Sequence, residues 1–170
     1  MLVIEILRGT PPWVFALLGY LAWRGAVRLK GGTSTPRRSA IVPMVFIVWG
    51  LSGLFQHDGN LHDLLLPWLA GCCVGMLAGR LIEPMPGIDR AAGLLHFGPS
   101  AIPLVRNVLL FCMHYFLHVA AALDAGFAPR MVAWDLLVSG VSAGYFLGWA
   151  IRLWRAWRAA PPAVPRVAGS

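Results

Sequence analysis

Apolar residues gather in five long runs separated by short polar segments, and this pattern predicts five helices that cross a membrane. A helix needs about 20 apolar residues to cross about 30 Å of hydrocarbon at about 1.5 Å per residue. The runs cover residues 12–29, 40–55, 64–82, 101–123 and 131–151. The second run is the shortest, so four complete spans with one re-entrant segment are the alternative. We expect an all-α, polytopic helix bundle over residues 1–160 and a disordered tail over 161–170.

The composition agrees with folding in lipid. Hydrophobic residues make up 58% of the 170 residues and charged residues only 12%, with a mean hydropathy of +0.69. In an average soluble domain, about a quarter of the residues are charged. The net charge of +7 is explained by basic loops that lie near anionic lipid headgroups. We therefore expect membrane lipid, and no nucleic acid, among the partners.

The charges between the runs predict an orientation. Lysine and arginine close to a span tend to stay in the cytoplasm. Residues 28–38 and 152–166 contain basic residues and no acid, whereas residues 56–63 contain acids and no lysine or arginine. These segments predict an N-terminus outside, a C-terminus in the cytoplasm and a location in the bacterial inner membrane. The long Pro- and Gly-rich connection at 83–103 would be cytoplasmic, with a short interfacial helix around 91–97.

Glycines at four-residue spacing predict close packing of two helices. This spacing places small residues on one helical face, where two backbones can approach each other. We expect the two faces to pair within the bundle or across a homodimer. They are formed by Gly71, Gly75 and Gly79 in the third run and by Gly140, Gly144 and Gly148 in the fifth.

Polar residues inside the fourth run are the main candidates for chemistry. Arg106, His114 and His118 share one helical face. Such groups are costly at membrane depth, so they usually face the bundle interior or water. Asp135 and Ser139 in the fifth run, together with Ser142, are the nearest polar residues by depth. Three interpretations stay open: a structural polar cluster, proton or ion handling, and contact with a metal, haem or quinone.

A second candidate site is the polar connection before the third run. His57 and His62 each precede an aspartate, and imidazole with carboxylate suits a divalent metal. Turn formation and helix capping explain the same residues without a metal. Cys72, Cys73 and Cys112 fall inside the runs and form no spaced metal motif. We expect no cofactor, with haem or a divalent metal as the alternative.

Several short motifs are spread along the chain, namely Thr10-Pro11 with Trp13-Val14, Arg37-Arg38 with Pro43-Met44, Gly50 and Ser52, Gly98-Pro99-Ser100 with Pro103-Leu104 and Arg106, and Gly144 to Gly148. In these motifs the chain resembles, over nearly its whole length, a family of small bacterial inner-membrane proteins of unknown function. The resemblance implies a membrane location and the same layout of spans, and it brings no reaction or ligand. Where this family commonly has a lysine-tyrosine pair, the chain has His114-Tyr115. A looser similarity links the chain to CcdC-like cytochrome c biogenesis membrane proteins through the basic loop and Pro43.

These observations predict a small integral membrane protein that acts as an accessory or partner-binding subunit rather than an enzyme. No phosphate-binding loop, dinucleotide-binding glycine motif, hydrolase triad order or metalloprotease signature occurs in the sequence. A second copy of the chain or another membrane protein would be its partner. The alternative is a protein that handles protons, ions, metal or haem with the polar face of the fourth run.

Overall fold

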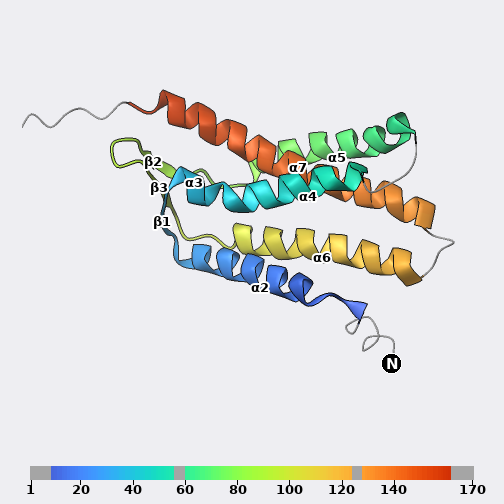
Figure 1. The fold of residues 1–170 in the computed structure, drawn as a ribbon. Coiled ribbons are helices and arrows are strands. Elements are labelled where there is room, and N and C mark those ends of the chain that lie inside the picture. Colours follow the sequence, from blue (N-terminus) through green and yellow to red (C-terminus); the bar gives the residue numbers. More distant parts are fainter. Residues whose placement is uncertain (1–8, 56–59, 124–127, 162–170) are drawn as a thin grey trace, which may run out of the picture.

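The long helices of the computed structural model lie side by side in a bundle (Figure 1). The structure describes residues 9–55, 60–123 and 128–161. Most of this part of the chain is helical. Three of the described helices are long and apolar enough to cross a membrane, namely α5 (Leu61–Leu81), α6 (Ile102–Leu123) and the segment Met131–Ala159 of α7 (Ala128–Ala159). The helices α2 (Pro12–Val27) and α4 (Ile41–Phe55) are shorter.

A small sheet lies at one end of the bundle, so the expectation of an all-α fold is wrong in this detail. The strands β1 (Gly32–Ser34), β3 (Leu94–Phe97) and β2 (Gly87–Asp89) are antiparallel and lie in this order. The predicted interfacial helix at 91–97 is also wrong, because this segment contains β3. Leu95 in β3 is fully buried, which anchors the sheet to the bundle.

Two further short elements connect α2 to α4 at the same end. A 3-10 turn, η1 (Arg28–Lys30), follows α2, and the short helix α3 (Pro36–Ser39) precedes α4. Gly31 ends the turn with a φ of +69°, a conformation that residues other than glycine rarely adopt. The chain therefore reverses direction tightly near the start of α6, where the backbone N–H of Ser100 donates to the oxygen of Arg28 at 3.0 Å.

The helix α7 is longer than its apolar run. It has 32 residues and is about 48 Å long at 1.5 Å per residue, whereas hydropathy ends the run at residue 151. Beyond this point the helix continues to Ala159 through leucine, arginine and alanine, which favour helices. The predicted tail 161–170 lies, apart from Pro161, outside the described residues.

The two glycine faces pack against each other between α5 and α7. A Cβ atom built on Gly75 would lie 2.1 Å from the backbone oxygen of Val141, and one on Gly144 would lie 2.1 Å from that of Cys72. The remaining members of both faces are equally close to the opposite backbone. These are Gly71, Gly79, Gly140 and Gly148. The pairing lies within one chain, which leaves these faces covered.

Aromatic and aliphatic side chains fill the interior between the helices. Phe46 of α4 and Phe146 of α7 stack with ring centroids 5.1 Å apart. This core separates two groups of polar side chains, one near the sheet and one further along the bundle. Its buried members are Leu21, Val42, Phe46, Leu110, Phe111, Tyr145 and Phe146.

Candidate functional site

The polar group nearest the sheet is built around Arg106 in the second turn of α6. Its Nη1 atom lies 2.6 Å from Oε2 of Glu83, which follows the end of α5. The hydroxyl of Tyr145 on α7 donates a hydrogen bond of 2.7 Å to the same oxygen. The side chains of Arg106 and Glu83 are only 12% and 7% exposed. This ion pair therefore joins three helices in a buried environment.

Asn107 extends this network to α2. Its Oδ1 atom accepts hydrogen bonds from Nε and Nη2 of Arg106, at 3.2 and 3.0 Å. Its Nδ2 atom donates to the backbone oxygen of Leu21 at 3.3 Å. The Arg106 guanidinium also lies 4.6 Å from the ring centroid of Phe146, which adds a cation–π contact. Arg106 is thus held by charge, hydrogen bonds and an aromatic face.

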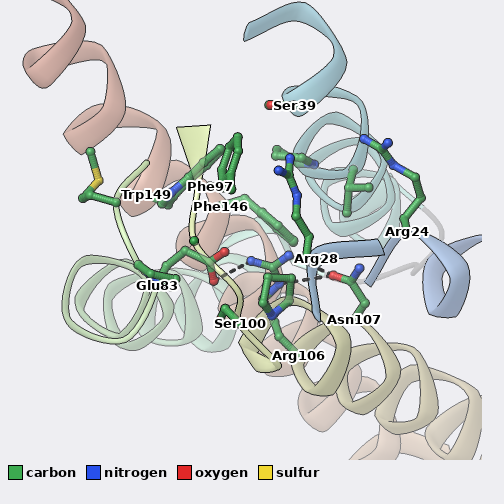
Figure 2. A pocket seen from close by; sticks show the side chains of 16 residues that line it. Arg24, Arg28, Ser39, Glu83, Phe97, Ser100, Arg106, Asn107, Phe146 and Trp149 are labelled. Atoms are coloured by element: carbon green, nitrogen blue, oxygen red, sulfur yellow. Dashed lines mark hydrogen bonds and ion pairs between the residues drawn. The ribbon is translucent and has the colours of Figure 1, made fainter. Parts of the chain in front are cut away.

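A pocket of about 60 Å³ lies beside Arg106 at the sheet end of the bundle (Figure 2). It lies where α2, α4, α6 and α7 meet the loops that carry the sheet. Three arginines and one carboxylate line it, together with Ser39, Ser100, Asn107 and Trp149. The charged members are Arg24, Arg28, Arg106 and Glu83.

Two buried hydrogen-bond donors that line the pocket have no partner among the described residues. They are the Oγ atom of Ser39 and the Nε1 atom of Trp149. Ser39 is 7% exposed and Trp149 is 6% exposed. A buried polar group without a partner costs about 1–3 kcal/mol, and most such groups are paired with protein or water. The pocket therefore offers two buried donors to whatever occupies it.

Arg24 and Arg28 lie at the pocket without a carboxylate partner in the described part of the chain. Arg24 donates through Nη2 to the backbone oxygen of Arg38 at 3.0 Å. The Arg28 guanidinium lies 3.5 Å from the ring centroid of Phe97 in β3. Both groups keep further N–H donors, because a guanidinium has five.

The second polar group lies between α6 and α7, further from the sheet. Nδ1 of His114 is 3.2 Å from Oδ1 of Asp135, and its Nε2 is 3.4 Å from Oγ of Ser142. The imidazole is 1% exposed, and the ring of Trp49 stacks on it with centroids 4.9 Å apart. His118 lies at the edge of this group, where its Nε2 is 3.8 Å from Asp135 and its side chain is 51% exposed.

The contacts of His114 place one ring nitrogen at a carboxylate oxygen and the other at a hydroxyl. The Ser142 hydroxyl also lies 3.0 Å from the backbone oxygen of Val138. Each ring nitrogen of an imidazole can donate or accept according to the tautomer. The group therefore joins α6 to α7 through buried polar contacts.

The structure divides the predicted polar face of the fourth run. Arg106 joins the group near the sheet, His114 joins Asp135, and His118 lies at the edge of the second group. Ser139 is buried one turn after Asp135. A Cβ atom built on Gly50 would lie 2.7 Å from the backbone oxygen of Ser139. Ser139 therefore belongs to a close contact between α4 and α7.

The predicted metal pair of His57 and His62 is not tested by the described residues. His57 lies outside the described residues. His62 is exposed and lies 3.6 Å from its neighbour Asp63. Within residues 9–55, 60–123 and 128–161, no group of three or more histidine, cysteine, aspartate or glutamate side chains is placed to hold a metal ion.

Sequence reasoning missed most of the pocket. Glu83 had a usable signal, since it is an acid at the end of an apolar run in an otherwise basic region. Asn107 had another, as an amide beside Arg106 inside an apolar run. Ser39, Trp149 and Tyr145 carry no local signal, because serine, tryptophan and tyrosine are common near membrane interfaces.

Comparisons of the chain with models of protein families, with curated proteins and with solved structures gave no match.

Proposed function

We propose that this chain is a five-span protein of the bacterial inner membrane, with its N-terminus outside and its C-terminus in the cytoplasm. The three long apolar helices support membrane insertion. The helices α2 and α4 have 16 and 15 residues and rise about 24 and 22 Å, so they would require local thinning of the bilayer or snorkelling of flanking arginines.

The distribution of basic residues supports this orientation. The sheet end of the bundle holds the end of α2, the start of α4, the end of α5, the start of α6 and the end of α7 (Figure 1). Lysine and arginine favour the cytoplasmic side. Those at or near this end are Arg24, Arg28, Lys30, Arg37, Arg38, Arg80, Arg90, Arg106, Arg152, Arg155 and Arg158.

Fusion of a reporter to the C-terminus tests the orientation. We expect a C-terminal green fluorescent protein to be fluorescent and a C-terminal alkaline phosphatase to be inactive, because the former folds in the cytoplasm and the latter outside it. An active phosphatase would show that the C-terminus lies outside, which contradicts the proposed orientation.

We propose further that the protein is an accessory subunit that binds a partner or ligand at its cytoplasmic end. The pocket supports this role, because it offers two buried donors without a partner and two arginines without a carboxylate. Membrane lipid would cover the exposed apolar faces. A second copy of the chain or another membrane protein would be the larger partner.

Site-specific photo-crosslinking in the native membrane tests this role. A photoreactive amino acid at Met85, which lines the pocket, is expected to give a discrete adduct. The control position is Leu109, an exposed apolar residue of α6, which is expected to label only lipid. Filling the pocket with Ser39→Leu should remove the Met85 adduct. Equal labelling from both positions would contradict a binding role at this end.

Proton handling at His114 is a second candidate function. The observation that favours it is the buried contact of His114 with Asp135, with the half-exposed His118 at its edge. Histidine is the side chain that ordinarily gains and loses a proton near neutral pH. His118 would connect the buried pair to the surface of the bundle.

Proton flux into liposomes distinguishes the two functions. The purified protein is placed in liposomes that contain a pH-sensitive dye. If the protein handles protons, the variants His114→Phe and His118→Leu should each lose most of the proton flux. The variant His96→Gln serves as a control, because His96 is exposed in β3. An accessory subunit should show no flux above empty liposomes, and it should tolerate both substitutions.

A further inference from the structure

We propose that the pocket at the sheet end binds a single phosphate group, either of an anionic lipid headgroup or of free phosphate. The inference rests on the proposed binding role and names the chemistry of what is bound.

The unpartnered donors require an acceptor. The indole N–H of Trp149 can donate a hydrogen bond but cannot accept one, and the same holds for the guanidinium groups of Arg24 and Arg28. Ser39 can do both. Oε2 of Glu83 already receives Arg106 and Tyr145. A molecule rich in hydrogen-bond acceptors therefore matches the donors that line the pocket.

The charge of the pocket favours an anion. Three guanidinium groups and one carboxylate line it, which leaves two positive charges in excess. Arg106 is neutralised by Glu83 at 2.6 Å. Arg24 and Arg28 form no ion pair among the described residues, and each is only partly exposed. A phosphate with one or two negative charges would balance this excess, and arginine is well suited to phosphate because of its planar fork of donors.

The small size of the pocket favours a compact anion. About 10–15 Å³ of cavity volume holds one water molecule, so a pocket of about 60 Å³ admits a group of phosphate size and excludes a much larger one. The donors belong to four elements, namely α2, η1, α3 and α7. A phosphate offers more acceptor oxygens to such donors than a carboxylate does.

The position of the pocket is compatible with both sources of phosphate. It lies at the ends of helices, where a membrane-spanning bundle would meet the headgroup layer. Basic pockets between helices on the cytoplasmic side are known to bind lipid headgroups. The rest of a lipid or of a soluble ester would remain outside, because the pocket holds only the phosphate.

Calorimetric titration of the full-length protein in a neutral detergent tests the inference. The probes are sodium phosphate and sodium acetate at equal ionic strength. We expect saturable binding of phosphate and at least about ten-fold weaker binding of acetate, since a charged hydrogen bond of about 1.5–3 kcal/mol corresponds to roughly ten-fold or more. Equal affinity for the two anions, or no saturable binding of phosphate, would overturn the inference.

Variants assign the binding to this pocket. Arg28→Gln is expected to weaken phosphate binding at least about ten-fold, and Ser39→Ala about three-fold, as a neutral hydrogen bond is worth less. Arg37→Gln is the matched control, because it removes an exposed arginine two residues before Ser39. This variant should change the affinity for phosphate less than about two-fold, because an exposed charge contributes little. If Arg37→Gln weakens binding as much as Arg28→Gln, phosphate is held by general charge and the site is refuted. Ser39→Ala keeps the test decisive if Arg28→Gln does not fold.

A lipid arm distinguishes the two sources. The protein is placed in nanodiscs of phosphatidylcholine with or without phosphatidylglycerol, and the phosphate titration is repeated. Loss of phosphate binding in the presence of phosphatidylglycerol would identify the lipid headgroup as the ligand, while unchanged binding would identify free phosphate. Failure of the Met85 crosslink with successful phosphate titration would refute the partner role alone. A Met85 adduct without phosphate binding would refute only the ligand assigned here.

Discussion

The close packing of α5 on α7 predicts that alanine at Gly75 destabilises the protein, although alanine favours helices. A Cβ atom on Gly75 would lie 2.1 Å from the backbone oxygen of Val141 and 2.8 Å from its Cα. Ordinary contacts of a Cβ atom begin at 3.4 Å. The two helices would therefore have to separate locally by about 1 Å, because backbone atoms cannot rotate away as side chains do.

The magnitude follows from two opposing terms. Over-packing of an interior costs about 1–3 kcal/mol, and exchange of glycine for alanine inside a helix returns about 0.5–1 kcal/mol. We expect Gly75→Ala to lower the free energy of unfolding by about 1–2 kcal/mol. The matched control is Gly19→Ala in the middle of α2, where an added Cβ meets nothing within 4 Å. This variant should gain about 0.5–1 kcal/mol.

Thermal unfolding in detergent micelles, followed by far-ultraviolet circular dichroism, measures both variants. The double variant Gly75→Ala with Gly144→Ala should lose less than the sum of its parts, because the first substitution already separates the helices where the second one acts. Equal melting temperatures for Gly75→Ala and Gly19→Ala would refute the packing described here, since the two sites differ only in what an added Cβ meets.

Three further predictions concern the buried polar groups, and all use the same unfolding assay. Glu83→Gln should cost about 3–5 kcal/mol, because it leaves the Arg106 cation buried without its carboxylate, whereas Tyr145→Phe should cost about 1–3 kcal/mol; a larger loss for Tyr145→Phe would contradict this order. A double-mutant cycle of His114→Phe and Asp135→Asn should give a coupling energy of about 0.5–3 kcal/mol, and a value of zero would show that the 3.2 Å contact contributes nothing. Arg152→Met should destabilise by about 1–3 kcal/mol, since Arg152 donates to the backbone oxygens of Arg80 and Glu83 at the end of α5, whereas Arg155→Met at an exposed position should have little effect.

Helix positions were predictable from sequence because hydropathy and local periodicity report them directly. The run at 101–123 corresponds to α6 (Ile102–Leu123), and the run at 40–55 corresponds to α4 (Ile41–Phe55). The fifth run underestimates α7, because hydropathy reports depth in lipid while the backbone stays helical beyond it. The glycine faces were recognisable for the same reason, since four-residue spacing is a local property of one helix.

The sheet and the pocket were not predictable because their contacts are not local. Thr33 pairs with His96 across the sheet, and nothing in either segment alternates strongly enough to indicate a strand. Glu83 meets Arg106 only because the connection at 83–103 returns the chain beside the end of α5. The glycines and prolines that allow this return also hide it, since they are read as a loop.

Aromatic side chains keep the two polar groups apart. From Arg106 the contacts run through Phe146, Phe46 and Trp49 to His114, with ring centroids 5.1 Å apart between the phenylalanines and 4.9 Å apart between Trp49 and His114. These rings offer no hydrogen-bonding chain along which a proton could move. Their packing is tight, and close-packed interiors shift between discrete arrangements rather than deform gradually. The pocket beside Arg106 and the His114–Asp135 pair are therefore separated by packed rings in this arrangement of the helices. Transfer of a proton between them along this path would require the rings of Phe46 and Phe146 to move apart.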